Sequence, residues 1–249
     1  MWKADRVLRS LRPVVMPALA PALGLVLTAA VVAGCSGGDD ESSPVGEEQT
    51  PAEVMDLAKT TFDETSGLSI TLTTDDLPEG VTGIVDASGV GTHAPAFEGS
   101  ITVVLLGQQV EVPVVAVDDK VYAQVPFTDG WQEIDPTEYG APDPAGLMST
   151  DAGFSALLPA TTGLEEGESV RGGANNDEVL TEYTGTVPDT AVKNVIPSAS
   201  GDFDATYTIT AEGELRAAVL TGVFYADSPE MTYTIGFDDY GTEQDITAP

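Results

Sequence analysis

His93 and Ser155 are the side chains best suited to catalysis in this chain. Ser155 lies in Gly153-Phe154-Ser155-Ala156-Leu157, which follows the G-x-S-x-G nucleophile elbow except for its second glycine. An α/β-hydrolase needs a histidine after that serine, and His93 is the only histidine. Without histidine or cysteine companions, His93 cannot form an ordinary zinc site. The sequence therefore predicts no catalytic residue, metal or cofactor, with Ser155 a helix residue and His93 a surface side chain.

Adjacent carboxylates are the other groups that could do chemistry. They occur at Asp75-Asp76, Asp118-Asp119, Glu165-Glu166 and Asp238-Asp239. Neighbouring residues of a strand point to opposite faces, whereas a glycosidase needs two carboxylates that face one cleft. A D-x-D-x-D-G calcium loop is also absent from the sequence. These pairs are interpreted as surface residues that favour solubility.

The single cysteine, Cys35, lies at the end of an apolar run that begins at Val14. A basic start precedes this run, which gives the charged, apolar and small-residue order of a secretory signal. Val32-Ala33-Gly34-Cys35 also matches the lipobox, whose cysteine thiol receives a diacylglyceryl group before the signal is cut. The sequence predicts a signal peptide over residues 1–34 and a lipidated Cys35 on the extracytoplasmic side of the cell membrane.

Two alternatives are an ordinary secretory signal and a plain transmembrane anchor. Against a long spanning helix stand the break at Gly34 and three prolines, at Pro13, Pro17 and Pro21.

The charge of the chain excludes several classes of partner. The whole sequence has a formal charge of −32, and the part after residue 34 keeps five basic and 40 acidic residues, a charge of −35. Nucleic acid is excluded because binding a polyanion needs clustered Lys and Arg. A basic patch that docks on anionic head groups is excluded for the same reason. The acidity is interpreted as a source of solubility.

A flexible acidic tether is predicted over residues 35–50. From Ser36 to Thr50 its only aliphatic residue is Val45, so this segment cannot bury enough apolar surface to fold. One domain is predicted over residues 51–249. It begins with a helix at about 51–65, because Pro51 suits a first turn and apolar residues then recur at helical spacing.

A strand period of two follows Gly67, where Leu68, Ile70 and Leu72 alternate with polar residues. Further strands are predicted at about 81–92, 97–106, 109–118 and 120–126, and the short links Gly107-Gln108 and Asp118-Asp119 indicate hairpins. Odd positions of 97–105 and even positions of 110–116 are apolar, while Pro113 indicates an edge or a bulge. Apolar residues on the second face as well indicate covering helices or a cavity.

In the segment 127–176, the main strand pattern is that of one short strand, whose last apolar residues are Trp131 and Ile134. Residues 135–144 are predicted as loop. Ser149-Thr150-Asp151 offers caps for a helix that contains Phe154 and Leu157 and that Pro159 stops. Strands at 177–187, 203–209, 215–225 and 231–237 follow, with a short helix over 189–196.

The order and spacing of these segments resemble the LppX/LprG-type lipoproteins of mycobacteria and related actinobacteria. The residues that carry the resemblance are the lipobox, the hairpin 115–123, Trp131 with the loop to the helix at 151–158, the segments 184–187 and 189–197, Asp239-Tyr240-Gly241, and the terminal Ala248-Pro249. The resemblance implies an α+β fold: a curved antiparallel half-barrel sheet with a few helices on its concave face, enclosing a hydrophobic cavity.

The resemblance also implies a function, that of a non-enzymatic carrier of complex lipids or lipoglycans across the cell envelope. Acyl chains would bind in the cavity, and a membrane transporter is a further implied partner. The side chains expected to contact the lipid are Ile101, Val103, Leu105, Val112, Val114, Val121 and Ala123 from strands, and Phe154 and Leu157 from the helical cover. The alternative is a tethered interaction module with a solid core that supports a transporter or envelope assembly.

Overall fold

The computed structural model describes residues 49–249 apart from 106, 140 and 174–175. The predicted signal peptide, Cys35 and the predicted tether up to residue 48 lie outside the described residues. Within the described part of the chain, no helix combines the length and the apolar character needed to cross a membrane.

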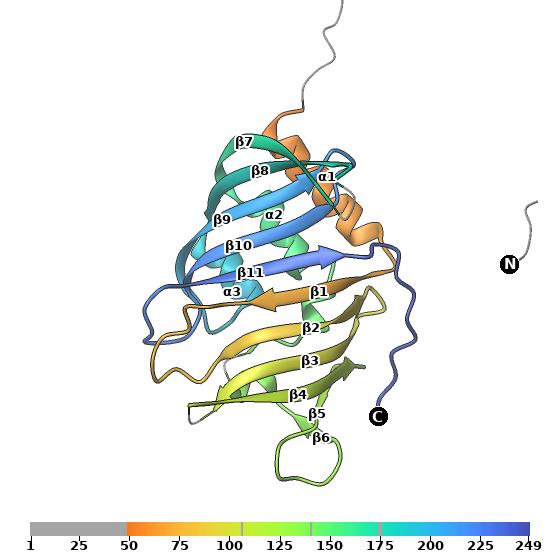
Figure 1. The fold of residues 1–249 in the computed structure, drawn as a ribbon, viewed down its shortest axis with the longest axis vertical. Coiled ribbons are helices and arrows are strands. Elements are labelled where there is room, and N and C mark those ends of the chain that lie inside the picture. The colour runs from red at the N-terminus through yellow and green to blue at the C-terminus, as the bar shows by residue number, and fades with distance from the viewer. Residues whose placement is uncertain (1–48, 106, 140, 174–175) are drawn as a thin grey trace, which may run out of the picture. The chain divides into compact units, whose positions relative to one another are not determined.

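Eleven strands form one antiparallel sheet in the order β6-β5-β4-β3-β2-β1-β11-β10-β9-β8-β7 (Figure 1). The sheet is curved and open, so the predicted α+β fold with a curved antiparallel sheet is confirmed. The strands are β1 Gly67–Thr73, β2 Ile84–Thr92, β3 Ala96–Leu105, β4 Gln108–Val117, β5 Lys120–Ala123, β6 Gln132–Ile134, β7 Thr162–Gly172, β8 Glu178–Val187, β9 Ser200–Thr210, β10 Leu215–Val223 and β11 Met231–Asp238.

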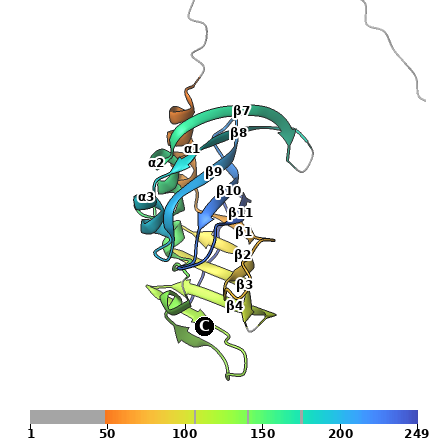
Figure 2. The same cartoon turned by 90° about the vertical axis from the view of Figure 1, so that its left-hand side faces the viewer.

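The helices lie together on one face of this sheet, the concave one, as predicted (Figure 2). Three are α-helices and three are short 3-10 turns. They are α1 Pro51–Glu64, α2 Leu157–Ala160, α3 Asp189–Val195, η1 Pro136–Tyr139, η2 Gly146–Met148 and η3 Phe154–Ala156.

Helix α1 begins with a capping box. The Thr50 hydroxyl accepts from the Glu53 N–H, and the Glu53 carboxylate accepts from the Thr50 N–H at 2.8 Å. The hydrogen bond from the Thr50 backbone is the main cause that lowers the pKa of Glu53, and the bond from the Thr50 hydroxyl acts in the same direction. The helix then buries Val54, Met55, Ala58 and Phe62 against the sheet side of the molecule.

The predicted hairpins between β3, β4 and β5 are present. Asp118 and Asp119 have φ angles of 55° and 59°, as a two-residue type I′ turn requires, and Val117 pairs with Lys120. Pro113 lies inside β4, which is not an edge strand. Proline has no N–H to donate, but none is needed at this position, because the pairing of β4 with β5 begins only at Val114. The Pro113 carbonyl accepts a hydrogen bond from the Gln124 N–H.

Strand β7 is the element that the sequence pattern does not predict. It forms one edge of the sheet, and nearly all of its side chains are exposed, so it lacks the alternation that identifies a half-buried strand. Two register shifts against β8, between Thr162 and Glu165 and between Glu166 and Ser169, blur the pattern further.

The helix predicted after Ser149 is shorter and begins later than expected. Gly153 precedes η3 and no side chain caps it, while the Ser149 hydroxyl accepts from the N–H of Ala152 in the preceding turn. Pro159 does not stop this helix but lies within α2. The proline is tolerated because it falls in the first turn, where no backbone N–H is needed.

The main hydrophobic core lies between the helices and strands β1 and β8–β11. Phe62 of α1 and Phe154 of η3 meet Phe237 of β11 there, with ring centroids 5.4 and 5.0 Å apart. A second buried cluster lies at the β3–β5 end of the sheet, and a third is formed by Ile246 near the C-terminus against Val115 and Val117. All of the predicted binding residues except Leu105 belong to the first two clusters.

Candidate functional site

Seven aliphatic side chains of β3, β4 and β5 form a continuous surface on the concave side of the sheet. Register places them together, because Ile101 pairs with Val112, Val103 with Val110, and Val114 with Ala123. We call this surface the apolar strip. It consists of Ile101, Val103, Val110, Val112, Val114, Val121 and Ala123, six of which were predicted to contact lipid.

Burial varies along the apolar strip. Ala123 and Val114 are 1% and 2% exposed, whereas Ile101, Val103 and Val110 are only half-buried. The strip therefore emerges from the core toward the β3–β4 hairpin. Leu105, also predicted to contact lipid, lies at that end of β3 and is 44% exposed, outside the cluster.

Phe154 and Leu157 are not part of the strip. They lie under the helices in the main core, where Phe154 stacks against Phe237. The ring of Phe97 separates the two regions, because it lies over Gly89 and Gly99, where added Cβ atoms would come within 3 Å of it. The predicted binding residues thus divide into a strand group and a helix group.

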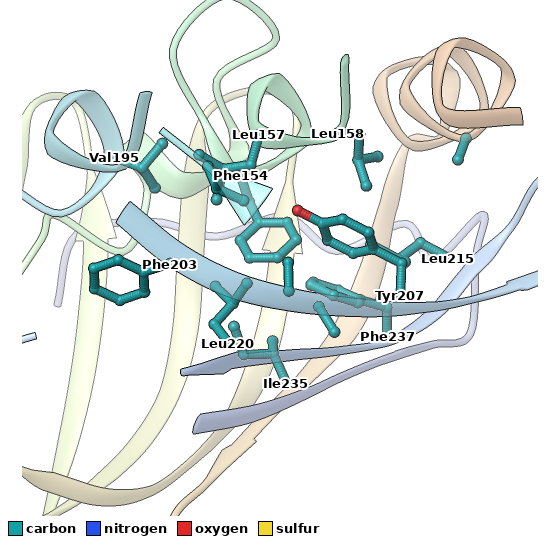
Figure 3. Packing of buried hydrophobic residues seen from close by; sticks show 14 of the residues in the cluster. Phe154, Leu157, Leu158, Val195, Phe203, Tyr207, Leu215, Leu220, Ile235 and Phe237 are labelled. Atoms are coloured by element: carbon teal, nitrogen blue, oxygen red, sulfur yellow. The ribbon is translucent and has the colours of Figure 1, made fainter. Parts of the chain in front are cut away.

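The interior under the helices is filled by side chains (Figure 3). Phe154, Leu157 and Leu158 point toward Tyr207 and Phe237 of the sheet. Tyr207 is fully buried, and its hydroxyl bonds Thr161 at 3.0 Å, while Thr161 in turn donates to the Leu157 carbonyl. Burial raises the pKa of Tyr207 to about 12.

Two tyrosines, Tyr225 and Tyr233, bind the first residue of β2. Tyr233 donates to the Ile84 carbonyl, Ile84 donates its N–H to the Tyr225 hydroxyl at 3.0 Å, and the two hydroxyls are 2.8 Å apart. Burial, first of all, raises the pKa of Tyr233. These bonds hold the start of β2 against β11 and against the β10–β11 loop, to which Tyr225 belongs.

Ser155 takes part in a half-buried polar cluster that holds α1 against η3. Its hydroxyl donates to Asp63 at 2.6 Å, and Asp63 also forms an ion pair with Lys59 one turn earlier. The Lys59 ammonium donates further to the Thr150 carbonyl at 2.7 Å. The same ammonium lies 3.4 Å from the Ser155 hydroxyl. The cluster therefore joins α1 to η3.

His93 performs a similar task and is half-buried, so the prediction of a surface histidine was wrong. Its Nδ1 lies 2.7 Å from the Met148 carbonyl and its Nε2 lies 2.8 Å from the Phe62 carbonyl. Both ring nitrogens lie next to backbone carbonyl oxygens, so His93 links the end of α1 to η2. Sequence could not reveal this role, since the partners are main-chain atoms.

Every basic side chain of the described residues has an acidic or carbonyl partner. Lys59, Lys120 and Lys193 form ion pairs with Asp63, Glu133 and Asp189. Arg171 donates to the Asp177 carbonyl, and Arg216 pairs with glutamates 178 and 214. The hydrogen bond from Arg216 lowers the pKa of Glu178. Four of the five lysines and arginines of the described residues are thus paired with carboxylates, while the exposed Arg171 has a backbone carbonyl as its partner.

Two pockets lined by described residues lie away from the space between sheet and helices. One, of about 540 Å³, surrounds Arg216 and is acidic; the other, of about 420 Å³, lies between the β1–β2 loop and the β3–β4 hairpin. The described residues hold no group of three or more His, Cys, Asp or Glu side chains placed to bind a metal ion.

Three comparisons place these features among known proteins. The family model described as LppX_LprAFG lipoprotein matches residues 50–247. A relative named lipoarabinomannan carrier protein LprG, from Mycolicibacterium hassiacum, is 28% identical over 91% of this chain and 96% of its own length. Crystal structures of LprF from Mycobacterium bovis and LppX from Mycobacterium tuberculosis have TM-scores of 0.62 and 0.57. They are 12% and 16% identical, and the alignments cover 80% and 79% of this chain and 96% and 97% of theirs.

Proposed function

Because this chain belongs to the LppX_LprAFG lipoprotein family, we propose that it is a lipid carrier anchored to the membrane through a lipidated Cys35. It binds the acyl chains of a complex lipid or lipoglycan on the apolar strip and carries them across the cell envelope, without catalysis. The strip is the observation that supports this function best: seven aliphatic side chains in register, deeply buried at one end and half-exposed at the other.

Hydrocarbon suits this surface better than any polar ligand. The strip presents no charged or hydrogen-bonding side chain, and an acyl chain gains about 0.8 kcal/mol for each methylene that it removes from water. A chain that covers Ile101, Val103 and Val110 would therefore bind through burial alone. The paired cations of the surface leave the head group in solvent.

Room for several acyl chains requires the covering segments to move. Ala145, from the loop before η2, contacts the strip. The main core lies next to it, beyond the ring of Phe97. Displacing the loop at 141–145 would extend the strip toward the core without unfolding a strand. The His93 contacts with the Met148 and Phe62 carbonyls and the Ser155–Asp63 bond lie outside that loop and would keep η2 and η3 against α1 meanwhile.

The relative's name supports a proposal for the lipid class. LprG is named a lipoarabinomannan carrier, and we propose an acylated lipoglycan or glycolipid as cargo here as well. A membrane transporter would hand on or receive such a cargo.

The filled core favours a second candidate, a tethered interaction module that supports a transporter or envelope assembly. In that case Phe154, Leu157 and Tyr207 are core residues only, and no lipid enters.

A bulky substitution on the strip separates the two candidates. Val103→Trp fills a half-buried place and should abolish uptake of a fluorescent fatty-acyl probe while the protein stays folded. Thr102→Trp is the matched control, because residue 102 is the next position of β3, is equally half-buried and faces the opposite side. Carriage is contradicted if the unsubstituted protein binds no probe or if both variants bind it equally well.

A further inference from the structure

Phe127 is displayed at the tip of the loop between β5 and β6. Its side chain is fully exposed, with a relative exposure of 107%, and its φ angle is 67°. The turn is closed by the Thr128 N–H, which donates to the Val125 carbonyl at 3.2 Å, with Pro126 at its second position. A turn with a positive φ at its third position favours Gly or Asn there, because most other side chains are strained in that backbone conformation. A bulky aromatic occupies it instead.

The loop holds this ring out on a braced base. Val125 packs against the apolar strip on one face of the sheet, and Trp131 packs against the Ile246 cluster on the other. Within the loop, the Thr128 hydroxyl donates to the Val125 carbonyl at 2.8 Å and Gln132 donates to the Asp129 carbonyl at 3.0 Å. The loop therefore holds the exposed ring in a fixed position. An exposed ring adds no packing to the fold, so the stability of the fold does not explain the strained position of Phe127.

We propose that Phe127 inserts into the surface of the lipid bilayer and brings the apolar strip next to the membrane. A single phenylalanine is too small to form a stable protein interface, which buries about 1,000 Å² or more. It suffices, however, for a protein that a lipid anchor already holds at the membrane, since a weak second contact then operates at high effective concentration. This inference rests on the proposed function in one respect, the lipid anchor at Cys35.

The predicted tether is long enough for this contact. The described chain begins at α1, beside β7, and the Phe127 loop lies at the opposite, β6 end of the sheet (Figure 1). Eleven strands at spacings of about 4.8 Å put these ends about 48 Å apart. The 15 residues from Ser36 to Thr50 span at most about 50 Å when extended. The ring thus reaches the bilayer that holds Cys35 when the tether is close to full extension.

The charges around the loop select the kind of lipid surface. Asp129 lies within the loop, and at its base Lys120 is neutralised by Glu133 at 2.7 Å. The net effect is a weakly acidic rim that anionic head groups would repel. A second copy of this acidic chain is disfavoured in the same way, so zwitterionic lipid is the appropriate test surface.

Fluorescence quenching tests the insertion directly. The full mature chain with its own anchor is placed in phosphatidylcholine vesicles whose acyl chains carry bromine. In a Trp131→Phe background, which removes the only tryptophan after residue 34, Phe127→Trp reports from the tip. Val170→Trp is the matched control: Val170 is 52% exposed and lies on β7, at the far end of the sheet.

The expected result is an about twofold or greater loss of fluorescence for Phe127→Trp and little loss for Val170→Trp, since only an indole within the acyl region meets bromine. Equal quenching of the two, or none at residue 127, overturns the proposal. Should Phe127→Trp not fold, native Trp131 gives a second readout. Brominated lipid should then quench the unsubstituted protein more than Phe127→Gly, and equal quenching overturns the proposal.

Failure of this inference is distinguishable from failure of the proposed function. A protein that carries lipid but shows no quenching at residue 127 refutes the membrane contact alone. A protein that is quenched there but carries no lipid refutes the carrier function alone.

Discussion

At the scale of single residues, Phe127 has the clearest energetic consequence, because its φ of 67° costs about 1–2 kcal/mol for an L-residue. Phe127→Gly removes this cost, partly offset by the greater freedom of glycine in the unfolded chain. We expect the free energy of unfolding to rise by about 0.5–1 kcal/mol in urea denaturation. Phe127→Ala keeps the Cβ atom and should change little. Equal effects of the two substitutions would show that the backbone is not strained.

Tyr207 makes the fold sensitive to alkali. Burial raises its pKa to about 12, so between pH 10 and 12 the unfolded chain loses the phenolic proton while the folded chain keeps it. Its contribution is complete below pH 10 and declines by about 2–3 kcal/mol as the pH rises to 12. Tyr207→Phe should therefore flatten the fall of stability with pH, measured by urea midpoints at several pH values. A fall as steep as in the unsubstituted protein would contradict this account.

At the scale of elements, helix α1 depends on its link to η3. Asp63→Ala leaves both Lys59 and Ser155 without their shared acceptor and should lower the free energy of unfolding by about 1–3 kcal/mol. Amide hydrogen exchange should rise in α1 before it rises in β9–β11. Glu64→Ala, at the exposed neighbouring position, is the control and should have little effect. Equal losses for both variants would show that the cluster does not hold the helix.

The elements also show what sequence could predict. Strands β3 and β4 were predictable because their apolar residues recur with a period of two at Ile101, Val103, Val112 and Val114. Strand β7 was not, because both of its sides are exposed. The division of the site between strip and main core could not be predicted either. It depends on Phe97 lying over glycines of two strands, a contact that no local pattern encodes.

At the scale of the whole molecule, the excess of negative charge opposes folding. The part after residue 34 carries a formal charge of −35, and four of its five lysines and arginines form ion pairs in the described structure. Salt screens the remaining repulsion. The urea midpoint should therefore rise as sodium chloride increases from about 0.01 M to 0.5 M, where the Debye length falls from about 30 Å to a few Å. A midpoint that falls with salt would indicate that ion pairs outweigh repulsion.

Native mass spectrometry of the protein gently extracted from its own membrane tests the carrier function most directly. We predict a species heavier than the anchored polypeptide by the mass of a multi-acylated lipid. Thr102→Trp should retain that species, and Val103→Trp should lose it. A mass equal to the anchored polypeptide alone, in every preparation, would contradict the claim that the apolar strip carries hydrocarbon.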